Sequence, residues 1–391
     1  MTEAVRKAGW FAYFPDNYRW SAAISMLCST SCWGAAVMGE IDQVGRRLAA
    51  RVGDDALWFR EWVRMGDRMR RLGMAAEREK RGLTAAAFYK RACTYYQAGE
   101  RFRTPKDRRA LGAYRKALDC FMRFARLTDR PRVERVEIPF EKGRSLPGLF
   151  VHAENTRRAK PPAVVFFDGL DVTKELQYML GTEDLVRRGI SVLLVDAPGN
   201  GEAIRFRKLY LRHDHEVAGA AALDYLETRP DVNAKRVAVM GISLGGYYAP
   251  RNASLERRFK ACVGWGVEPD YHERWRKRIA ASFKTALSVP SHHIQWILNA
   301  KSLEEALGKL EPFRLDGVVQ KMRCPYLLVH GEDDQQVPLE SARALFRMVG
   351  SKDKTLKVFT GSEGGAQHCQ MDNAPLAAAF IHDWLKEKLG A

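Results

Sequence analysis

The chain has 391 residues, of which 46% are hydrophobic, so it is long and apolar enough to bury a sizeable core. Its seven cysteines show no close metal-type pairing, which argues against a disulfide framework and a zinc site and favours a reducing compartment. The formal net charge of +17 would suit a nucleic-acid partner, but no nucleic-acid-binding motif accompanies it.

Residues 1–130 are predicted to form an all-helical domain. Three segments there have apolar residues at helical spacing with arginines between them: 54–81, 83–99 and 106–127. The domain contains 26 Lys and Arg against 14 Asp and Glu and therefore holds most of the excess positive charge. Four arginines share one predicted helix face, as is typical of a solvated surface: Arg60, Arg64, Arg68 and Arg71. We expect no nucleic-acid partner, and an anionic or phenolate substrate steered to a pocket is the better explanation of the charge.

Neither a secretion signal nor a membrane span is expected. Pro15 and Asp16 interrupt the N-terminus before any apolar core of a signal peptide could form. The stretch 21–39 lacks charged residues, but its Ser, Thr, Cys and Gly content is more typical of a buried helix or helix pair than of a span. We therefore expect a cytoplasmic protein without a membrane partner.

Residues 131–391 change to an alternation of strands and helices. Segments 132–140 and 146–152 are predicted to pair as antiparallel strands around a turn at 142–143. Six further strands are predicted at 162–167, 191–195, 236–240, 262–266, 326–330 and 356–360. A closing helix is predicted from Ala374 to Lys388. The alternation predicts an α/β fold with a mostly parallel sheet.

The insert at about 267–323 and the histidines at 213 and 215 are relevant to a functional site. The helical insert at about 267–323 falls where such folds carry a short cap insertion over the active site. His213 and His215 invite a metal interpretation, but no further ligand cluster accompanies them. Asp214 is expected instead to cap the helix that follows, 216–229. We expect no metal and no cofactor.

The motif Gly-Ile-Ser-Leu-Gly at 241–245 follows the apolar run 236–240 and precedes a helix-compatible stretch. Strand, sharp turn and helix are the context of a nucleophile elbow, in which Ser243 would lie exposed on a strained turn. The flanking glycines have a physical reason, because neighbouring Cβ atoms would collide with the packed strand and helix. The motif predicts a serine hydrolase with Ser243 as its nucleophile.

Two later strand ends offer the partners that such a serine needs. Asp333 and Asp334 follow the strand at 326–330, and His368 follows the glycine-rich segment after the strand at 356–360. The chain order Ser, Asp, His is that of α/β-hydrolases. Asp334 is favoured because its spacing from Val-Pro places it at the tip of the loop, and Asp333 is the alternative.

An oxyanion hole requires two N–H groups aimed at one point. One is expected from Leu244, immediately after the nucleophile. The other is expected from Leu170, in the glycine turn that ends the strand at 162–167. Asp171 could instead orient that turn.

Several short motifs together resemble one family: Phe-Pro-Asp-Asn-Tyr-Arg-Trp-Ser at 14–21, Gly-Glu-Ile-Asp at 39–42, Gly-Leu-Asp at 169–171 with Lys-Glu at 174–175, Trp-Gly at 265–266 and Gln-His-Cys at 367–369. Over nearly its whole length the chain is similar to α/β-hydrolases with an N-terminal helical lid. That family includes dihydroxypseudooxynicotine hydrolase and the fungal yellowish-green pigment-pathway enzymes that shorten aromatic polyketides. The resemblance implies an α/β-hydrolase core over 131–391, a lid over 1–130 that closes on the active site, and a homodimer.

The same resemblance implies the reaction. It is hydrolysis of a carbon–carbon bond beside a ketone in an acyl-aromatic or β-diketone compound, and the residues that match the triad are Ser243, Asp334 and His368. In the nicotine-degrading relative a glutamate past the Trp-Gly segment assists cleavage, and the candidates here are Glu273 and Glu268.

Two other functions stay open, and a third is disfavoured. An ordinary esterase or lactonase would use the same triad, and so would an enzyme that transfers an acyl group to an acceptor other than water. A pseudo-enzyme whose basic helices bind partners is disfavoured because the predicted triad is complete.

Overall fold

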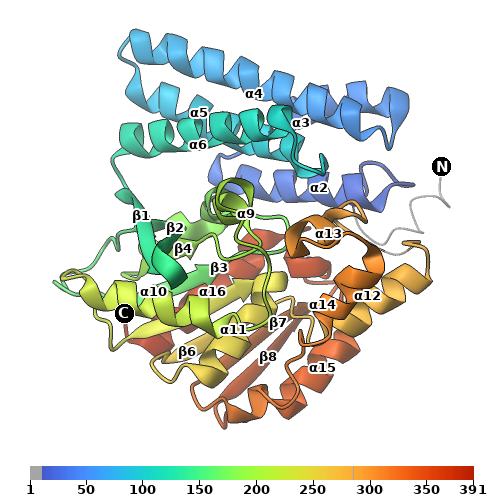
Figure 1. The fold of residues 1–391 in the computed structure, drawn as a ribbon. Coiled ribbons are helices and arrows are strands. Elements are labelled where there is room, and N and C mark those ends of the chain that lie inside the picture. Colours follow the sequence, from blue (N-terminus) through green and yellow to red (C-terminus); the bar gives the residue numbers. More distant parts are fainter. Residues whose placement is uncertain (1–10, 285) are drawn as a thin grey trace. The chain divides into compact units, whose positions relative to one another are not determined.

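The computed structural model describes residues 11–284 and 286–391, and the chain divides into two compact units (Figure 1). The helical unit comprises Met1–Arg132 together with Ala286–His293. The sheet unit comprises Val133–Thr285 together with Ile294–Ala391. Among the described residues, no helix is long and apolar enough to cross a membrane.

Five helices and two short 3-10 turns form most of the helical unit: α2 (Tyr18–Thr30), η1 (Ser31–Trp33), α3 (Met38–Leu48), η2 (Ala49–Arg51), α4 (Asp55–Arg78), α5 (Gly82–Arg101) and α6 (Arg108–Thr128). The last three are long, and they lie along one another (Figure 1). Asp54 and Asp107 begin α4 and α6 by accepting backbone N–H groups of the first turn. Close packing depends on glycine, because a Cβ on Gly66 would lie 2.7 Å from the ring of Tyr96.

Contacts with buried aromatic side chains explain the motifs at 14–21 and 39–42, which contain Trp20 and Glu40. Ring centroids of Trp20 and Trp58 are 4.9 Å apart, and those of Trp58 and Trp62 are 5.7 Å apart. Tyr95 donates its hydroxyl hydrogen to Glu40 at 2.6 Å, which ties α5 to α3. Within the uncharged stretch 21–39, helix α2 is largely buried, as expected, whereas Val37 and Met38 after it are exposed.

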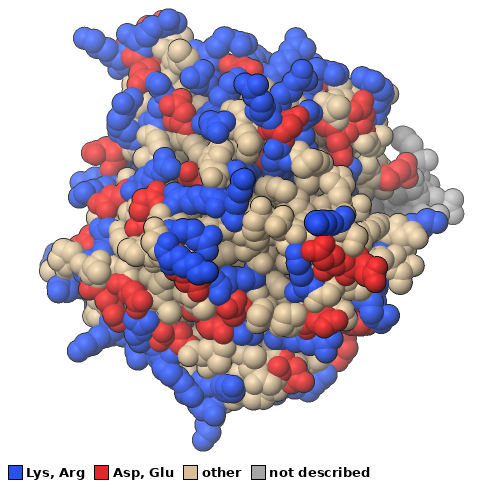
Figure 2. All heavy atoms as spheres, in the orientation of Figure 1, with Lys and Arg blue, Asp and Glu red and all other residues tan. Residues whose placement is uncertain are grey.

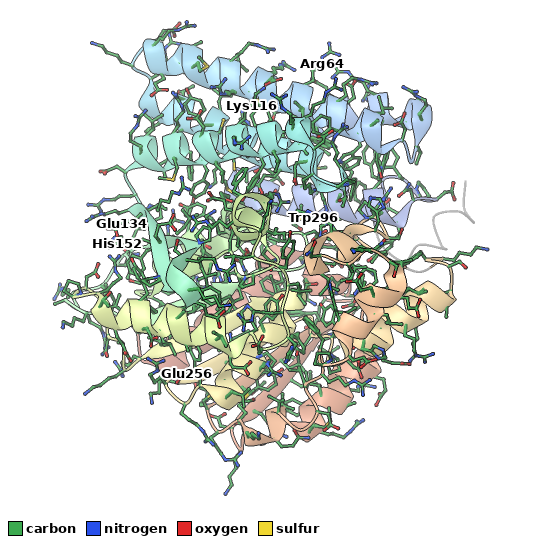
Figure 3. The ribbon with its side chains drawn as sticks, in the orientation of Figure 1. Arg64, Lys116, Glu134, His152, Glu256 and Trp296 are labelled. Carbon is green, nitrogen blue, oxygen red and sulfur yellow. The ribbon has the colours of Figure 1, made fainter. Side chains whose placement is uncertain are left out.

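The positive charge of the helical unit is largely at its surface. Figure 2 shows many Lys and Arg side chains over α4 to α6, with Asp and Glu between them. Arg64 is 68% exposed in its side chain, in keeping with a solvated face (Figure 3). Lys116 of α6 is instead tied to α4, since its ammonium group lies 2.8 Å from Asp67.

The sheet unit contains one eight-stranded sheet of order β1-β2-β4-β3-β5-β6-β7-β8. Its strands are β1 (Val133–Phe140), β2 (Arg144–Val151), β3 (Ala163–Phe167), β4 (Ser191–Val195), β5 (Val237–Ile242), β6 (Ala261–Trp265), β7 (Tyr326–Gly331) and β8 (Lys354–Phe359). β2 pairs antiparallel with β1 and with β4, and the other pairs are parallel. At the antiparallel edge, His152 Nε2 lies 2.8 Å from Glu134 of β1 (Figure 3). The predicted mostly parallel α/β sheet is confirmed.

These strands are connected by η3 (Glu141–Gly143), α7 (Lys174–Gln177), η4 (Tyr178–Thr182), α8 (Glu183–Val186), α9 (Gly201–Arg207), α10 (Glu216–Thr228), α11 (Leu244–Leu255), α12 (Tyr271–Ala280), α13 (His293–Leu298), α14 (Leu303–Leu310), η5 (Val319–Lys321) and α15 (Leu339–Met348). After the last strand come η6 (His368–Gln370) and α16 (Ala374–Leu389). The predicted helical insert between β6 and β7 contains α12, α13 and α14. The core strands β3 to β7 are buried along their whole length, as expected for parallel strands covered on both faces.

The prediction that Asp214 caps α10 is wrong. The N-cap residue is His215, and no side chain makes a capping hydrogen bond there. Both carboxylate oxygens of Asp214 are instead held by Arg212, each at 2.6 Å. A bidentate pair with a guanidinium is stronger than a single bond to a backbone N–H, so the arginine outcompetes the helix end.

Candidate active site

Ser243 lies in the sharp turn between β5 and α11. Its φ of 56° and ψ of −112° are strained for a residue with a side chain. The flanking glycines make the turn possible. A Cβ on Gly241 would lie 1.8 Å from the carbonyl oxygen of Gly245, and a Cβ on Gly245 would lie 2.2 Å from that of Phe167.

The structure brings Ser243, His368 and Asp334 together from three separate strand ends. His368 Nε2 lies 2.9 Å from Ser243 Oγ, and His368 Nδ1 lies 2.7 Å from Asp334 Oδ2. His368 and Asp334 are only 5% and 6% exposed. The three side chains therefore form one continuous hydrogen-bonded chain at the carboxyl edge of the sheet.

Asp334 is held as a carboxylate. Its Oδ1 accepts the backbone N–H groups of Gln336 and Val337, each at 2.8 Å. Burial opposes ionisation, but the charge and hydrogen bond of His368 outweigh it and lower the pKa of Asp334. Asp333, the alternative, is exposed, and its backbone N–H donates to Ala366. The structure thus brings Asp334 rather than Asp333 to the histidine.

His368 is prepared to take up a proton. Burial by itself would lower its pKa, but the negative charge of Asp334 outweighs burial and raises the pKa well above the usual range of histidine. In the neutral ring, Nδ1–H donates to Asp334 and leaves the Nε2 lone pair facing the hydroxyl of Ser243. This arrangement lets His368 act as a general base toward the serine.

The two residues expected to supply oxyanion N–H groups lie at the same edge. Leu244 is the first residue of α11, so its N–H belongs to the positive end of that helix. Leu170 follows β3 and is 9% exposed. Its neighbour Gly169 lies against the nucleophile, because a Cβ on Gly169 would be 3.4 Å from Ser243 Cβ.

The two candidate accessory acids have opposite surroundings. Glu268 follows β6, is 5% exposed, and contacts Arg274 Nε at 2.5 Å. Burial raises its pKa despite that arginine. Glu273 is partly exposed on α12, where the hydrogen bond from Arg276 lowers its pKa to about 2. A proton donor at neutral pH needs a raised pKa, so the structure favours Glu268.

The segment that carries Glu268 lies beside the histidine. A Cβ on Gly266 would lie 3.3 Å from His368 Cε1 and 2.5 Å from Cys369 Sγ. The Trp-Gly and Gln-His-Cys motifs are joined through Gln370, whose Oε1 accepts the Trp265 indole N–H at 2.6 Å. Gln370 was not among the predicted site residues, although its position directly after the Gln-His-Cys motif was a signal.

His330 is a second neighbour that sequence analysis missed. It lies at the end of β7, fully buried, with Nε2 2.9 Å from the carbonyl oxygen of Val337 and 3.6 Å from Asp334 Oδ2. Burial lowers its pKa, so the ring stays neutral and its N–H holds the Asp334 loop. A polar residue at the end of an otherwise apolar strand was the available signal.

His213 and His215, the two histidines that invited a metal interpretation, both pack near aromatic rings. His215 stacks on Tyr248 with ring centroids 3.6 Å apart, and burial lowers its pKa to about 3. His213 packs near Phe313, with centroids 6.2 Å apart. Across 11–284 and 286–391, no group of three His, Cys, Asp or Glu side chains could hold a metal ion.

Comparison with known proteins identifies the family. A family model described as "Esterase FrsA-like" matches residues 47–303, more than half of the chain. The chain belongs to the FrsA-like esterase family. Hydrolase LUC6 of a Fusarium species is 31% identical, over 96% of this chain and 98% of the relative. The 20-hydroxy-prefusarin hydrolase FUS2 of Gibberella moniliformis is 28% identical, over 92% of this chain and 94% of the relative.

A solved structure shares the fold. The 2,6-dihydroxy-pseudo-oxynicotine hydrolase superposes with a TM-score of 0.76 at 22% identity, over 93% of this chain and 95% of that one. The family resemblance expected from the motifs is therefore confirmed. The protein is a hydrolase with the α/β-hydrolase fold.

Proposed function

We propose that the protein is a serine hydrolase that cleaves a carbon–carbon bond beside a ketone in an acyl-aromatic or β-diketone compound of polyketide type. Ser243, His368 and Asp334 are its triad. The observation that carries the proposal is the continuous hydrogen-bonded chain from Ser243 Oγ through His368 to Asp334 in a family of hydrolases. The motif resemblance to enzymes that shorten polyketides supports the choice of bond.

The first step forms an acyl-enzyme. Ser243 Oγ bonds to the ketone carbon while its proton moves to His368 Nε2, and the carbonyl electron pair becomes an alkoxide held by the N–H groups of Leu244 and Leu170. The alkoxide then re-forms the carbonyl and expels the neighbouring carbon with its bonding electrons. The proton on His368 then replaces the one that the leaving carbon takes from its acid, so the ring is neutral again. Water attacks the ester on Ser243 while His368 accepts its proton, and collapse returns that proton to Ser243 Oγ and releases a carboxylic acid.

Expulsion of carbon is the difficult step. A carbanion is a poor leaving group unless it is an enolate or an electron-rich ring that receives a proton as the bond breaks. We assign that proton donor to Glu268, because burial raises its pKa and the segment 266–268 lies beside His368. General acid catalysis of this kind contributes a factor of about 10² to 10⁴ in rate.

The helical unit and the insert have proposed roles in the same reaction. Residues 1–130 would serve as a lid for the core formed by 131–391, and the insert at 267–323 as a cap. The excess of Lys and Arg in 1–130 would favour an anionic or phenolate substrate. The motif resemblance further supports a homodimer, and the free cysteines among the described residues fit the cytoplasm.

A carboxylesterase or lactonase is the second candidate, and the esterase-like family match favours it. Acyl transfer to an acceptor other than water would use the same acyl-enzyme.

A substrate panel separates these functions. Purified enzyme would be tested on a p-nitrophenyl ester, a β-diketone, an acylphenol and a lactone, with products identified by mass spectrometry. We expect the β-diketone or acylphenol to yield a carboxylic acid and the shortened ketone or arene, with a higher kcat/KM than the lactone. Turnover of esters and lactones with none of the ketones would establish the second candidate, and an acylated acceptor among the products would indicate transfer.

A further inference from the structure

A buried cluster of charged side chains lies at the carboxyl ends of β3 and β4, outside the triad. Lys174 is at its centre. The Lys174 ammonium group is 2.9 Å from Asp196 Oδ2, 2.6 Å from Glu202 Oε1 and 2.7 Å from Glu175 Oε1. All four side chains are at most 5% exposed. A lysine has three N–H donors, so these three carboxyl groups satisfy it completely.

Asp168 adds a fourth acid to the cluster. It follows β3 directly and is fully buried. Burial and the negative charge of Asp196 raise the pKa of Asp168 well above its usual range. Asp196 is also buried, but Lys174 outweighs that burial and lowers its pKa. Burial, the charge of Asp196 and the hydrogen bond between the two acids therefore all favour the protonated form of Asp168.

Through these bonds Asp196 holds both ends of the loop 168–174, which joins β3 to α7. At the first end it is hydrogen-bonded to the carboxyl group of Asp168. At the other end its Oδ1 accepts the backbone N–H of Lys174 at 2.9 Å. Its Oδ2 also accepts the backbone N–H of Glu202 at 2.8 Å, so the loop after β4 is fixed to the same carboxylate.

The middle of the loop lies next to the nucleophile. Asn200, from the loop after β4, donates a side-chain N–H to the carbonyl oxygen of Gly169. A Cβ on Gly169 would lie 3.4 Å from Ser243 Cβ. The next residue is Leu170, the second oxyanion donor of the proposed function. A shift of this loop would move that N–H without changing the hydrogen bonds of the triad.

We propose that Lys174 and Asp196 are positioning residues of the oxyanion hole, which hold the loop 168–174 so that the Leu170 N–H points at the oxygen of the reacting carbonyl. The inference rests on the proposed function, because it requires acyl transfer at Ser243. A cluster of buried charges contributes little to folding stability, because well-packed apolar side chains in the same place often stabilise a protein as much or more. A preorganised oxyanion donor, in contrast, lowers the barrier directly.

Replacing Lys174 by Met tests the inference, since Met keeps most of the length and removes the charge. We expect kcat on a p-nitrophenyl ester to fall ~100-fold, as when one oxyanion donor is lost, with little change in KM. Affinity for phenylboronic acid, which forms a tetrahedral adduct with a nucleophilic serine, should fall in parallel. Lys388→Met is the control, because its ammonium group also lies 2.9 Å from a carboxylate, that of Asp353, in a part of the sheet unit that carries no proposed catalytic residue. It should leave kcat unchanged.

A second pair of variants decides the matter if the Lys174 variant does not fold. Asp168→Asn keeps a donor toward Asp196, whereas Asp168→Ala removes it. We expect the Asn variant to retain most of kcat and the Ala variant to lose kcat and boronate affinity together. Equal kcat in the two Asp168 variants, or wild-type kcat in a folded Lys174→Met, would overturn the inference.

Ser243→Ala, measured in parallel, keeps the two proposals distinguishable. Loss of turnover in Ser243→Ala with wild-type kcat in Lys174→Met would remove only the positioning role. Turnover that survives in Ser243→Ala would overturn the proposed function, and the oxyanion inference with it.

Discussion

Replacing Asp334 by Asn removes one negative charge and keeps the shape of the side chain. In the structure, one carboxylate oxygen accepts the N–H groups of Gln336 and Val337, and the other accepts the Nδ1–H of His368 at 2.7 Å. An amide oxygen can replace only one of these acceptors. Because two backbone N–H groups fix the amide oxygen, we expect the amide NH2 to face His368, whose Nδ1 must then accept.

The ring would therefore carry its proton on Nε2, the atom 2.9 Å from Ser243 Oγ. A protonated Nε2 cannot take up the serine proton, so the base is lost although every heavy atom stays in place. The expected loss in kcat is on the order of 10⁴. It corresponds to about 5 kcal/mol of transition-state stabilisation. KM should change little, because no substrate contact is removed.

The assay is kcat and KM on the best ketone and on a p-nitrophenyl ester, measured across a range of pH. Asp333→Asn is the matched control, since it makes the same chemical change at the exposed neighbouring residue, and it should keep wild-type kcat. Asp334 raises the pKa of His368. The residual activity of Asp334→Asn should therefore reach half of its maximum at a lower pH than the activity of the wild type does. A large loss in Asp333→Asn with little in Asp334→Asn would refute the reasoning.

Three further predictions concern the proton donor, acid stability and the helical unit. Glu268→Gln should lower kcat on the ketone by about 10² or more and spare the p-nitrophenyl ester, whose leaving group needs no proton, whereas Glu273→Gln should affect neither. Equal losses on both substrates would contradict this role. Burial lowers the pKa of His382 to about 3 in the folded protein, whereas an unfolded histidine has a pKa of about 6.5. Only the unfolded chain therefore takes up a proton at this residue as the pH falls from about 6.5 to about 3, and folding stability is lost over that range. Between pH 7 and pH 5.5, the free energy of unfolding in urea should fall by about 1.3 kcal/mol less for His382→Gln than for the wild type, and identical losses would refute this prediction. Deleting 1–130 should give a poorly soluble core that cleaves small activated esters slowly and has lost the bulky ketone, and full ketone activity would exclude a lid role.

The sheet and the elbow could be predicted because their signals are local. Continuous apolar runs mark buried parallel strands, and β3 to β7 begin and end close to the predicted positions. Gly241 and Gly245 are dictated by collisions with backbone oxygens of the elbow itself and of β3, so the motif predicts its own turn.

What the sequence could not settle depends on partners far along the chain. Glu268 and Glu273 are five residues apart, yet only one of them is buried, because the choice depends on how the segment after β6 packs. Lys174 stands out in the sequence only as part of a family motif, and Asp196 does not stand out at all. Their hydrogen bonds exist only because β3 and β4 are neighbours in the sheet.

The nucleophilic role of Ser243 is tested most directly by covalent labelling. A fluorophosphonate, which phosphonylates nucleophilic serines, would be incubated with the enzyme, and the modified peptide would be identified by mass spectrometry. We predict a single adduct on Ser243, formed at the rate at which activity is lost, and none in a folded Ser243→Ala variant. An adduct on another serine that accompanies the loss of activity, or ketone turnover by Ser243→Ala, would contradict the assignment.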